Sequence, residues 1–195
     1  MVLLFVLFLI MIILIGGTPK AGKTQVARML QQKLSCTVFS MDEILKLFSC
    51  VYPSSPFGSG FEISERVSFS RKVLESLVRI HTDLQEIIIV EGDLIMPEDC
   101  ELYKNINPTI VFHFVVYTEI SEETKHIKIQ AAKKHYAQDD DSFNHNIVDE
   151  GLELGREIVE KCKTHSLNYT IINSDFNRRV DLVVDSLYRL AVEAG

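Results

Sequence analysis

Five short apolar runs alternate along the chain with longer segments whose apolar residues recur every three or four positions. The runs are rich in Val, Ile and Phe, and they span residues 11–15, 36–39, 87–90, 110–116 and 169–172. Such runs are typical of strands that are buried on both faces. The segments that we expect to be helices are residues 22–34, 65–83, 121–136, 147–163 and 179–194. This alternation predicts an α/β fold, with a parallel sheet covered by helices on both faces.

Two polar segments interrupt this pattern; we interpret the first as a turn-rich loop and expect the second to be mobile. Residues 52–60 are rich in Pro, Ser and Gly, and residues 138–146 are rich in Asp and Asn. Neither segment has the composition of a linker between domains, and the chain contains no internal repeat. At 195 residues, we expect residues 1–195 to form a single domain, since domains average about 150 residues.

The composition narrows the functional classes. The chain has 20 Lys and Arg against 27 Asp and Glu, a net charge of −7. This acidic balance argues against a broad nucleic-acid-binding face. The four cysteines lie far apart and without metal-ligand spacing, so we expect reduced thiols in a cytoplasmic protein. The six histidines form no ligand set either, and we expect His113, inside an apolar run, to be a core residue.

The N-terminal residues 1–15 are all apolar. They are shorter than the roughly 18 to 20 residues that span a bilayer, and no basic residue precedes them as in a signal peptide. We expect either that Met11 is the natural start or that the apolar extension of residues 1–10 lengthens the first strand. The alternative is a membrane anchor, although we expect no stable membrane insertion.

The strongest motif is a glycine-rich loop between the first predicted strand and the first predicted helix. Its eight residues fit the pattern GxxxxGK[ST] in full. In such a loop, backbone N–H groups and the helix N-terminus hold phosphate oxygens, the lysine reaches the β- and γ-phosphates, and the hydroxyl ligates Mg²⁺. The predicted nucleotide-binding residues are Gly17, Thr18, Pro19, Lys20, Ala21, Gly22, Lys23, Thr24 and the following Gln25.

Acidic residues follow the next two predicted strands, where ligands of an open parallel sheet bind. Asp42 follows the second strand and is our candidate base for an acceptor hydroxyl; alternatively, it caps a helix. Glu91 ends the third strand and is our candidate acid near Mg²⁺; alternatively, it is a solvated strand end. Asp93 is a weaker candidate, because it can cap the following turn.

Three phrases, GGTPKAGKT, SMDEIL and IIIVEGDLIMP, together resemble the P-loop kinases of small molecules. Residues 91–97 are similar to the 2-phosphoglycerate kinase and uridine kinase-like branches. The position of Asp42 is similar to the acceptor aspartate of the shikimate kinase, chloramphenicol phosphotransferase and zeta-toxin groups. The resemblance implies a three-layer P-loop NTPase fold with a sheet order of 2-3-1-4-5 and a helical lid at residues 121–146. It also implies ATP as the donor with Mg²⁺, and places Asp42 and Glu91 beside Lys23 and Thr24.

The predicted lid departs from this family pattern, because residues 120–146 contain no arginine. Lysine supplies charge but not the bidentate fork of arginine. Lys125 and Lys128 lie one turn apart, and we expect Lys128 to contact the nucleotide; alternatively, both lie on a solvated face. Arg156 is a further candidate for the missing charge. By the same resemblance, Asp175 lies in the loop beside the nucleotide base.

The main functional hypothesis is an ATP-dependent kinase that phosphorylates a hydroxyl of a small molecule. Arg66 or Arg71 is a candidate to hold an anionic acceptor; alternatively, both are exposed helix charges. Two other classes stay open: a nucleotide-binding regulator or ATPase without a small-molecule acceptor, and a phosphotransferase that modifies an antibiotic or a nucleotide sugar.

Overall fold

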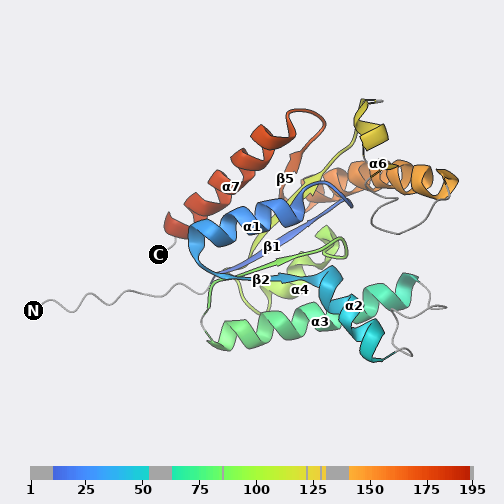
Figure 1. Cartoon of the computed structure of the whole chain (residues 1–195). Coiled ribbons are helices and arrows are strands. Elements are labelled where there is room, and N and C mark those ends of the chain that lie inside the picture. The colour runs from blue at the N-terminus through green and yellow to red at the C-terminus, as the bar shows by residue number, and fades with distance from the viewer. Residues whose placement is uncertain are drawn as a thin grey trace, which may run out of the picture.

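Five parallel strands form the centre of the molecule (Figure 1). The computed structural model describes residues 11–52, 63–84, 86–121, 123–127, 129–130 and 141–193. The strands are β1 (Ile12–Gly17), β2 (Thr37–Ser40), β3 (Ile88–Glu91), β4 (Val111–Val116) and β5 (Asn168–Ile171). They pair in the order β2-β3-β1-β4-β5, which confirms the predicted fold class and strand order.

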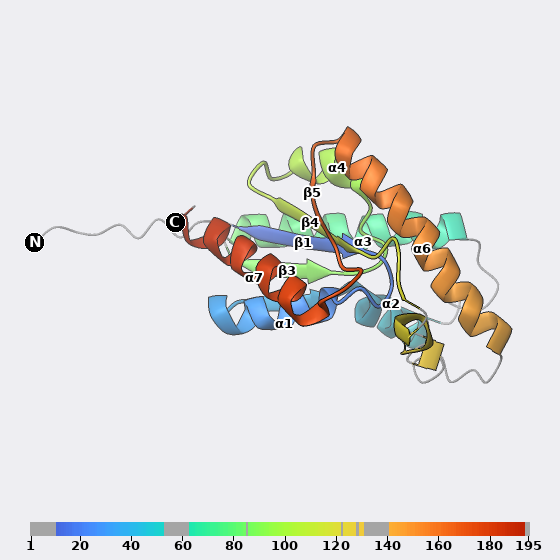
Figure 2. The same cartoon turned by 90° about the horizontal axis from the view of Figure 1, so that it is seen from above.

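Helices connect the strands and enclose the sheet from both sides. They are α1 (Lys23–Leu34), α2 (Met41–Val51), α3 (Ile63–Leu84), the 3-10 turn η1 (Pro97–Asp99), α4 (Cys100–Lys104), α6 (Asp141–Thr164) and α7 (Phe176–Glu193). Residues 123–127 and 129–130 are also helical. Viewed from above, α1 and α7 lie on one side of the sheet, and α3, α4 and α6 lie on the other (Figure 2).

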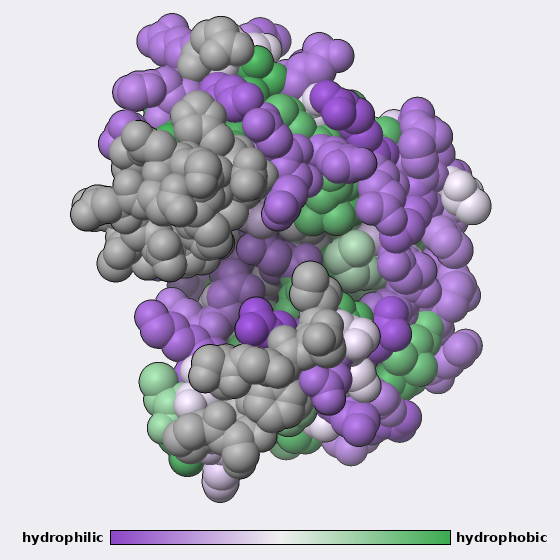
Figure 3. All heavy atoms as spheres, turned by 90° about the vertical axis from the view of Figure 1, so that its right-hand side faces the viewer, coloured by the Kyte–Doolittle hydropathy of each residue, from purple (hydrophilic) through white to green (hydrophobic). Residues whose placement is uncertain are grey.

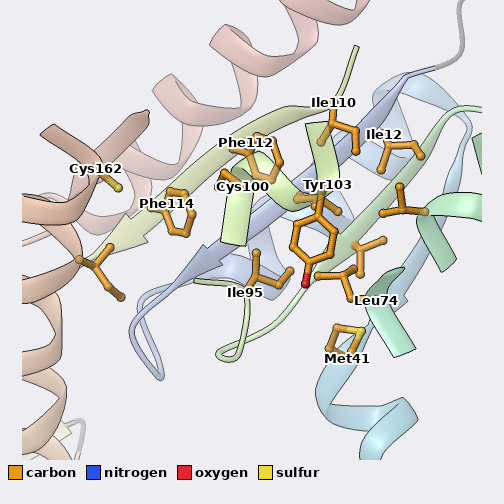
Figure 4. Close-up of a cluster of buried hydrophobic side chains, with 14 of the residues drawn as sticks. Ile12, Met41, Leu74, Ile95, Cys100, Tyr103, Ile110, Phe112, Phe114 and Cys162 are labelled. Atoms are coloured by element: carbon orange, nitrogen blue, oxygen red, sulfur yellow. The ribbon is translucent and has the colours of Figure 1, made fainter. Parts of the chain in front are cut away.

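The alternation of side chains along β1 builds two separate cores. Ile13 and Ile15 point toward α1 and α7, whereas Ile12 and Leu14 point toward α3, α4 and α6. On the second face, Tyr103, Phe112 and other large side chains pack between strands and helices (Figure 4). Because β1 is central and completely buried, it reads as a continuous apolar run rather than an alternating one.

Several predicted boundaries differ from the structure. The helix predicted at residues 147–163 is longer in the structure, because α6 begins at Asp141 and ends at Thr164. It therefore includes residues 141–146 of the polar segment that we expect to be mobile, while residues 138–140 lie outside the described residues. The extension of residues 1–10 and most of the loop at 52–60 also lie outside the described residues. Among the helices described, none has the length and apolarity needed to cross a membrane.

Leu14→Ala should destabilise the fold, because Leu14 is fully buried in the central strand. We expect a loss of about 2–5 kcal/mol in the free energy of unfolding, the range for Leu→Ala changes that leave a cavity. The control is Leu47→Ala on α2, where the side chain is 63% exposed; it should change stability by less than about 0.5 kcal/mol. Urea unfolding of both variants checks this, and equal effects would contradict the packing described here.

Candidate active site

The carboxyl ends of the strands border one large cavity of about 1030 Å³. Figure 3 looks onto this side of the molecule and shows hydrophilic residues lining a recess. Residues from five connections reach it: the glycine-rich loop after β1, the start of α2 after β2, the turn after β3, the helical segment 123–127 after β4, and the loop between β5 and α7. This is the position at which open α/β sheets bind ligands.

The glycine-rich loop leaves the sheet through a close backbone contact. Gly17 has a φ of 130°, in the region that favours glycine, and a Cβ there would overlap the carbonyl oxygen of Val115. The next residue, Thr18, donates its N–H to the same Val115 oxygen at 3.2 Å. Its buried hydroxyl accepts the N–H of Tyr117 at 3.3 Å. The loop entrance is therefore fixed to β4 and to the segment that follows it.

Lys23 folds back over this loop at the first position of α1. Its Nζ donates to the carbonyl oxygens of Thr18 at 2.7 Å and Gly17 at 3.2 Å, and it also forms an ion pair with Asp93. The side chain is buried, so the ammonium group depends on these partners to offset the cost of leaving water. Its position at the N-terminus of α1 is that of a lysine that contacts phosphate.

Thr24 and Glu91 form the pair that is suited to a magnesium ion. The Thr24 hydroxyl donates to the Glu91 carboxylate at 3.2 Å, and Glu91 is almost completely buried at the end of β3. Hydroxyl and carboxylate oxygens are the ligand types that Mg²⁺ prefers. The donor set therefore fits the predicted ion, and these two residues would hold it.

Asp42 reaches the cavity from the first turn of α2. This helix starts directly after β2, with Ser40 rather than Asp42 at the N-cap position, so the alternative of a capping role for Asp42 is wrong. A glycine after β3 makes the approach of α2 possible, since a Cβ on Gly92 would lie 2.7 Å from the Cβ of Met41. The Asp42 carboxylate accepts the backbone N–H of Asp93, which holds it beside the turn after β3.

The pKa of Asp42 is raised to about 6, first because surrounding protein desolvates the carboxylate and then because Asp93 and Glu91 repel its charge. Lys23 and the hydrogen bond from Asp93 act in the opposite direction. The side chain still opens onto the cavity and is exposed there. On the same side, burial lowers the pKa of Lys20, which the carboxylates of Asp93 and Asp42 partly offset.

The loop between β5 and α7 closes the opposite side of the cavity. Asn173 accepts the N–H groups of Thr118 and Glu119 at 3.0 and 3.2 Å, which ties this loop to the chain after β4. Asp175 lines the cavity, and its place beside a nucleotide base stays a prediction. The ring of Phe176 packs on the glycine-rich loop so closely that a Cβ on Gly22 would lie 2.9 Å from it.

The structure brings most of the predicted residues together. The cavity is lined by Pro19, Lys20, Gly22, Lys23, Thr24, Asp42, Glu91 and Asp175. Gly17, Thr18 and Ala21 belong to the loop but are not among the described lining residues. Thr18 and Ala21 are buried, and Thr18 attaches the loop to β4. Gln25 is exposed on α1 and is not among the lining residues.

Some candidates lie elsewhere. Arg71 does not reach the cavity, because both Nε and a terminal nitrogen bind the buried Asp99 carboxylate at 2.8 Å. Arg66, Arg156 and Lys125 are also absent from the described cavity lining, and Lys125 pairs with Asp149 at 2.6 Å. Lys128 lies outside the described residues.

His113 is buried as expected and lies 3.0 Å from the Thr170 hydroxyl. Burial lowers the pKa of this histidine to about 4.

Two contributors were missed or undervalued in the sequence. Asp93 is only a weaker candidate in the sequence, where it can cap a turn, yet in the structure it contacts Lys23. The position two residues beyond Glu91 was the only signal for it. The sequence indicates no role for Phe176, which directly follows Asp175. No local pattern shows that its ring packs on Gly22, because that contact joins residues 154 positions apart in the sequence.

The solved structures that share this fold include small-molecule kinases. The chain superposes on a gluconokinase from Sinorhizobium meliloti with a TM-score of 0.57 and 12% identity, covering 95% of each chain. A sugar kinase from Janibacter sp. gives 0.60 and 9%, covering 93% of this chain and 94% of that one. A shikimate kinase from Acinetobacter baumannii in complex with shikimate gives 0.56 and 16%, covering 95% and 94%.

At these identities, the likeness establishes the fold. This fold is the one that the resemblance of the motifs implied. No protein-family model and no curated protein sequence matches the chain.

Asp42→Asn should stabilise the protein at neutral pH but not in acid. Since the pKa of Asp42 is raised from 3.8 to about 6 in the folded state, the wild type loses stability as the pH rises through this interval. Asparagine does not ionise and keeps that stability. Because the carboxylate is open to solvent, screening limits the gain to about 1 kcal/mol.

Thermal unfolding at about pH 4, 6 and 8 measures this difference. Asp181→Asn, an exposed change on α7, serves as the control. An advantage of Asp42→Asn that stays constant across this range would contradict the assignment.

Proposed function

We propose that this protein is a kinase that transfers the γ-phosphoryl group of ATP to a hydroxyl of a small molecule. One observation carries the proposal: a phosphate-binding lysine, a hydroxyl–carboxylate pair suited to Mg²⁺ and a carboxylate with raised pKa meet in one cavity. The fold shared with small-molecule kinases supports it.

The glycine-rich loop and Lys23 have the task of holding the donor. Backbone N–H groups of the loop bind the phosphates, and Lys23 neutralises the charge that builds up on the γ-phosphate and the leaving ADP. Thr24 and Glu91 would hold Mg²⁺, which would supply positive charge to neutralise the phosphates. Since phosphoryl transfer needs mainly positioning and charge neutralisation, these contacts account for most of the expected rate enhancement.

Asp42 is assigned to the acceptor. Its carboxylate orients the hydroxyl and takes its proton as the new oxygen–phosphorus bond forms and the bond from the γ-phosphorus to ADP breaks. A pKa of about 6 leaves the carboxylate ionised at neutral pH but still basic enough to accept the proton, as suits a general base.

The start of α2 suggests where the acceptor lies and what charge it carries. Asp42, Lys46 and Ser49 all line the cavity, at the i, i+4 and i+7 spacing of one helix face. Lys46 therefore stands one turn from the candidate base, where it can bind a carboxylate or phosphate of the acceptor. This supports the prediction of an anionic acceptor, with Lys46 replacing Arg71 in that role.

Lys23→Ala should strongly weaken nucleotide binding and abolish transfer. We expect ATP·Mg²⁺ to bind on the order of 100-fold more weakly, since removal of one partner of a buried charge contact costs about 2–5 kcal/mol. The control, Lys33→Ala, removes an exposed lysine from the same helix that pairs with Asp185. Isothermal titration calorimetry checks both variants; wild-type affinity in Lys23→Ala would refute the assigned phosphate site.

Asp42→Asn should leave ATP binding within about threefold of wild type but lower kcat on the order of 10²–10⁴-fold, the usual contribution of a general base. ADP release is measured with a panel of hydroxylated acids, phosphorylated alcohols, nucleosides and antibiotic alcohols. Transfer that survives the substitution would remove Asp42 as the base. ADP release that no acceptor stimulates would instead favour the ATPase or regulator class.

A further inference from the structure

Asp93, which lies in the turn after β3, forms an ion pair with Lys23. Lys23 is 4% exposed, whereas the Asp93 side chain is 31% exposed and lies at the cavity edge. The pair therefore joins a buried cation to a carboxylate that can move into the cavity without unfolding any strand or helix. The mechanism proposed above assigns no role to this carboxylate.

The donors of Lys23 are fully used in this arrangement. An ammonium group has three N–H donors, and the structure gives Lys23 three partners: the carbonyl oxygens of Gly17 and Thr18, and the carboxylate of Asp93. The two carbonyls belong to a loop that is fixed to β4. A phosphate that binds Lys23 must therefore take the place of Asp93.

Release of Asp93 changes the charge that the phosphate meets. The freed carboxylate stays beside Asp42, which it repels, and Glu91 repels the Asp42 carboxylate as well. A nucleotide polyphosphate then faces three carboxylates at short range, which opposes binding unless a divalent cation enters with it.

We propose that Asp93 pairs with Lys23 where a phosphate would otherwise bind, and thereby makes nucleotide binding depend on a divalent cation. Asp93 is in this sense a positioning residue. This inference rests on the proposed nucleotide site. Asp93 acts through Lys23 and through the charge of the cavity, not by contact with the transferred group. Removal of the Asp93 carboxylate should therefore strengthen the binding of nucleotide without a cation more than the binding of nucleotide with one.

Asp93→Asn tests the inference through binding rather than turnover. The dissociation constant of ATP is measured by calorimetry with excess EDTA and again with saturating Mg²⁺. In EDTA, the variant should bind ATP about tenfold more tightly than wild type, because a competing carboxylate and its repulsion are gone. With Mg²⁺, the two proteins should differ by less than about threefold, so the stimulation of binding by Mg²⁺ falls.

Glu43→Gln is the matched control, because it removes one negative charge from the same cavity. Glu43 is not one of the three described partners of Lys23. It should retain the strong Mg²⁺ dependence of the wild type. Asp93→Ser is the second neutral variant, in case Asp93→Asn does not fold, and Asp93→Glu should restore the dependence on Mg²⁺.

Three outcomes would overturn the inference. Unchanged or weaker ATP binding by the neutral variants in EDTA would show that Asp93 does not compete with phosphate. An equal gain in Glu43→Gln would assign the effect to the overall charge of the cavity. Failure of the wild type to bind ATP even with Mg²⁺ would instead refute the proposed function, and this inference with it.

Discussion

The close approach of β1 to β4 at Gly17 is the contact on which the rest of the site depends. Because Val115 leaves no room for a side chain there, the chain passes from strand to loop at a fixed point and direction. The buried Thr18 extends this attachment to Tyr117. Lys23 can therefore fold back onto carbonyl oxygens whose positions are set by the sheet, not by the loop alone.

A second constraint is charge. The described residues that line the cavity include three lysines and five carboxylates, and no arginine. An acidic lining around a phosphate site means that a polyanion and a cation bind better together than either does alone. The lid sequence at residues 120–146 likewise lacks arginine, so the function proposed above would rely on Lys23 and a metal ion to neutralise charge.

The sequence predicted the fold well because its signals are local. Buried parallel strands and the full phosphate-loop pattern require no knowledge of distant contacts, and both appear where expected. Arg71 failed as an acceptor ligand because its partner, Asp99, comes from η1, 28 residues away. Asp93 was undervalued for the same reason: its role arises from contact with Lys23 across the sheet, 70 residues earlier in the chain. Long-range pairing of charges leaves no periodic trace in one sequence.

The turn at residues 91–93 connects every part of the site. Glu91 accepts a hydrogen bond from Thr24, and Gly92 leaves room for Met41 at the start of α2. Asp93 pairs with Lys23 and donates its backbone N–H to Asp42. The relative positions of Lys23, the Thr24–Glu91 pair and Asp42 are thus set by one short piece of backbone. A displacement of this turn must therefore disturb the contacts of all these residues together.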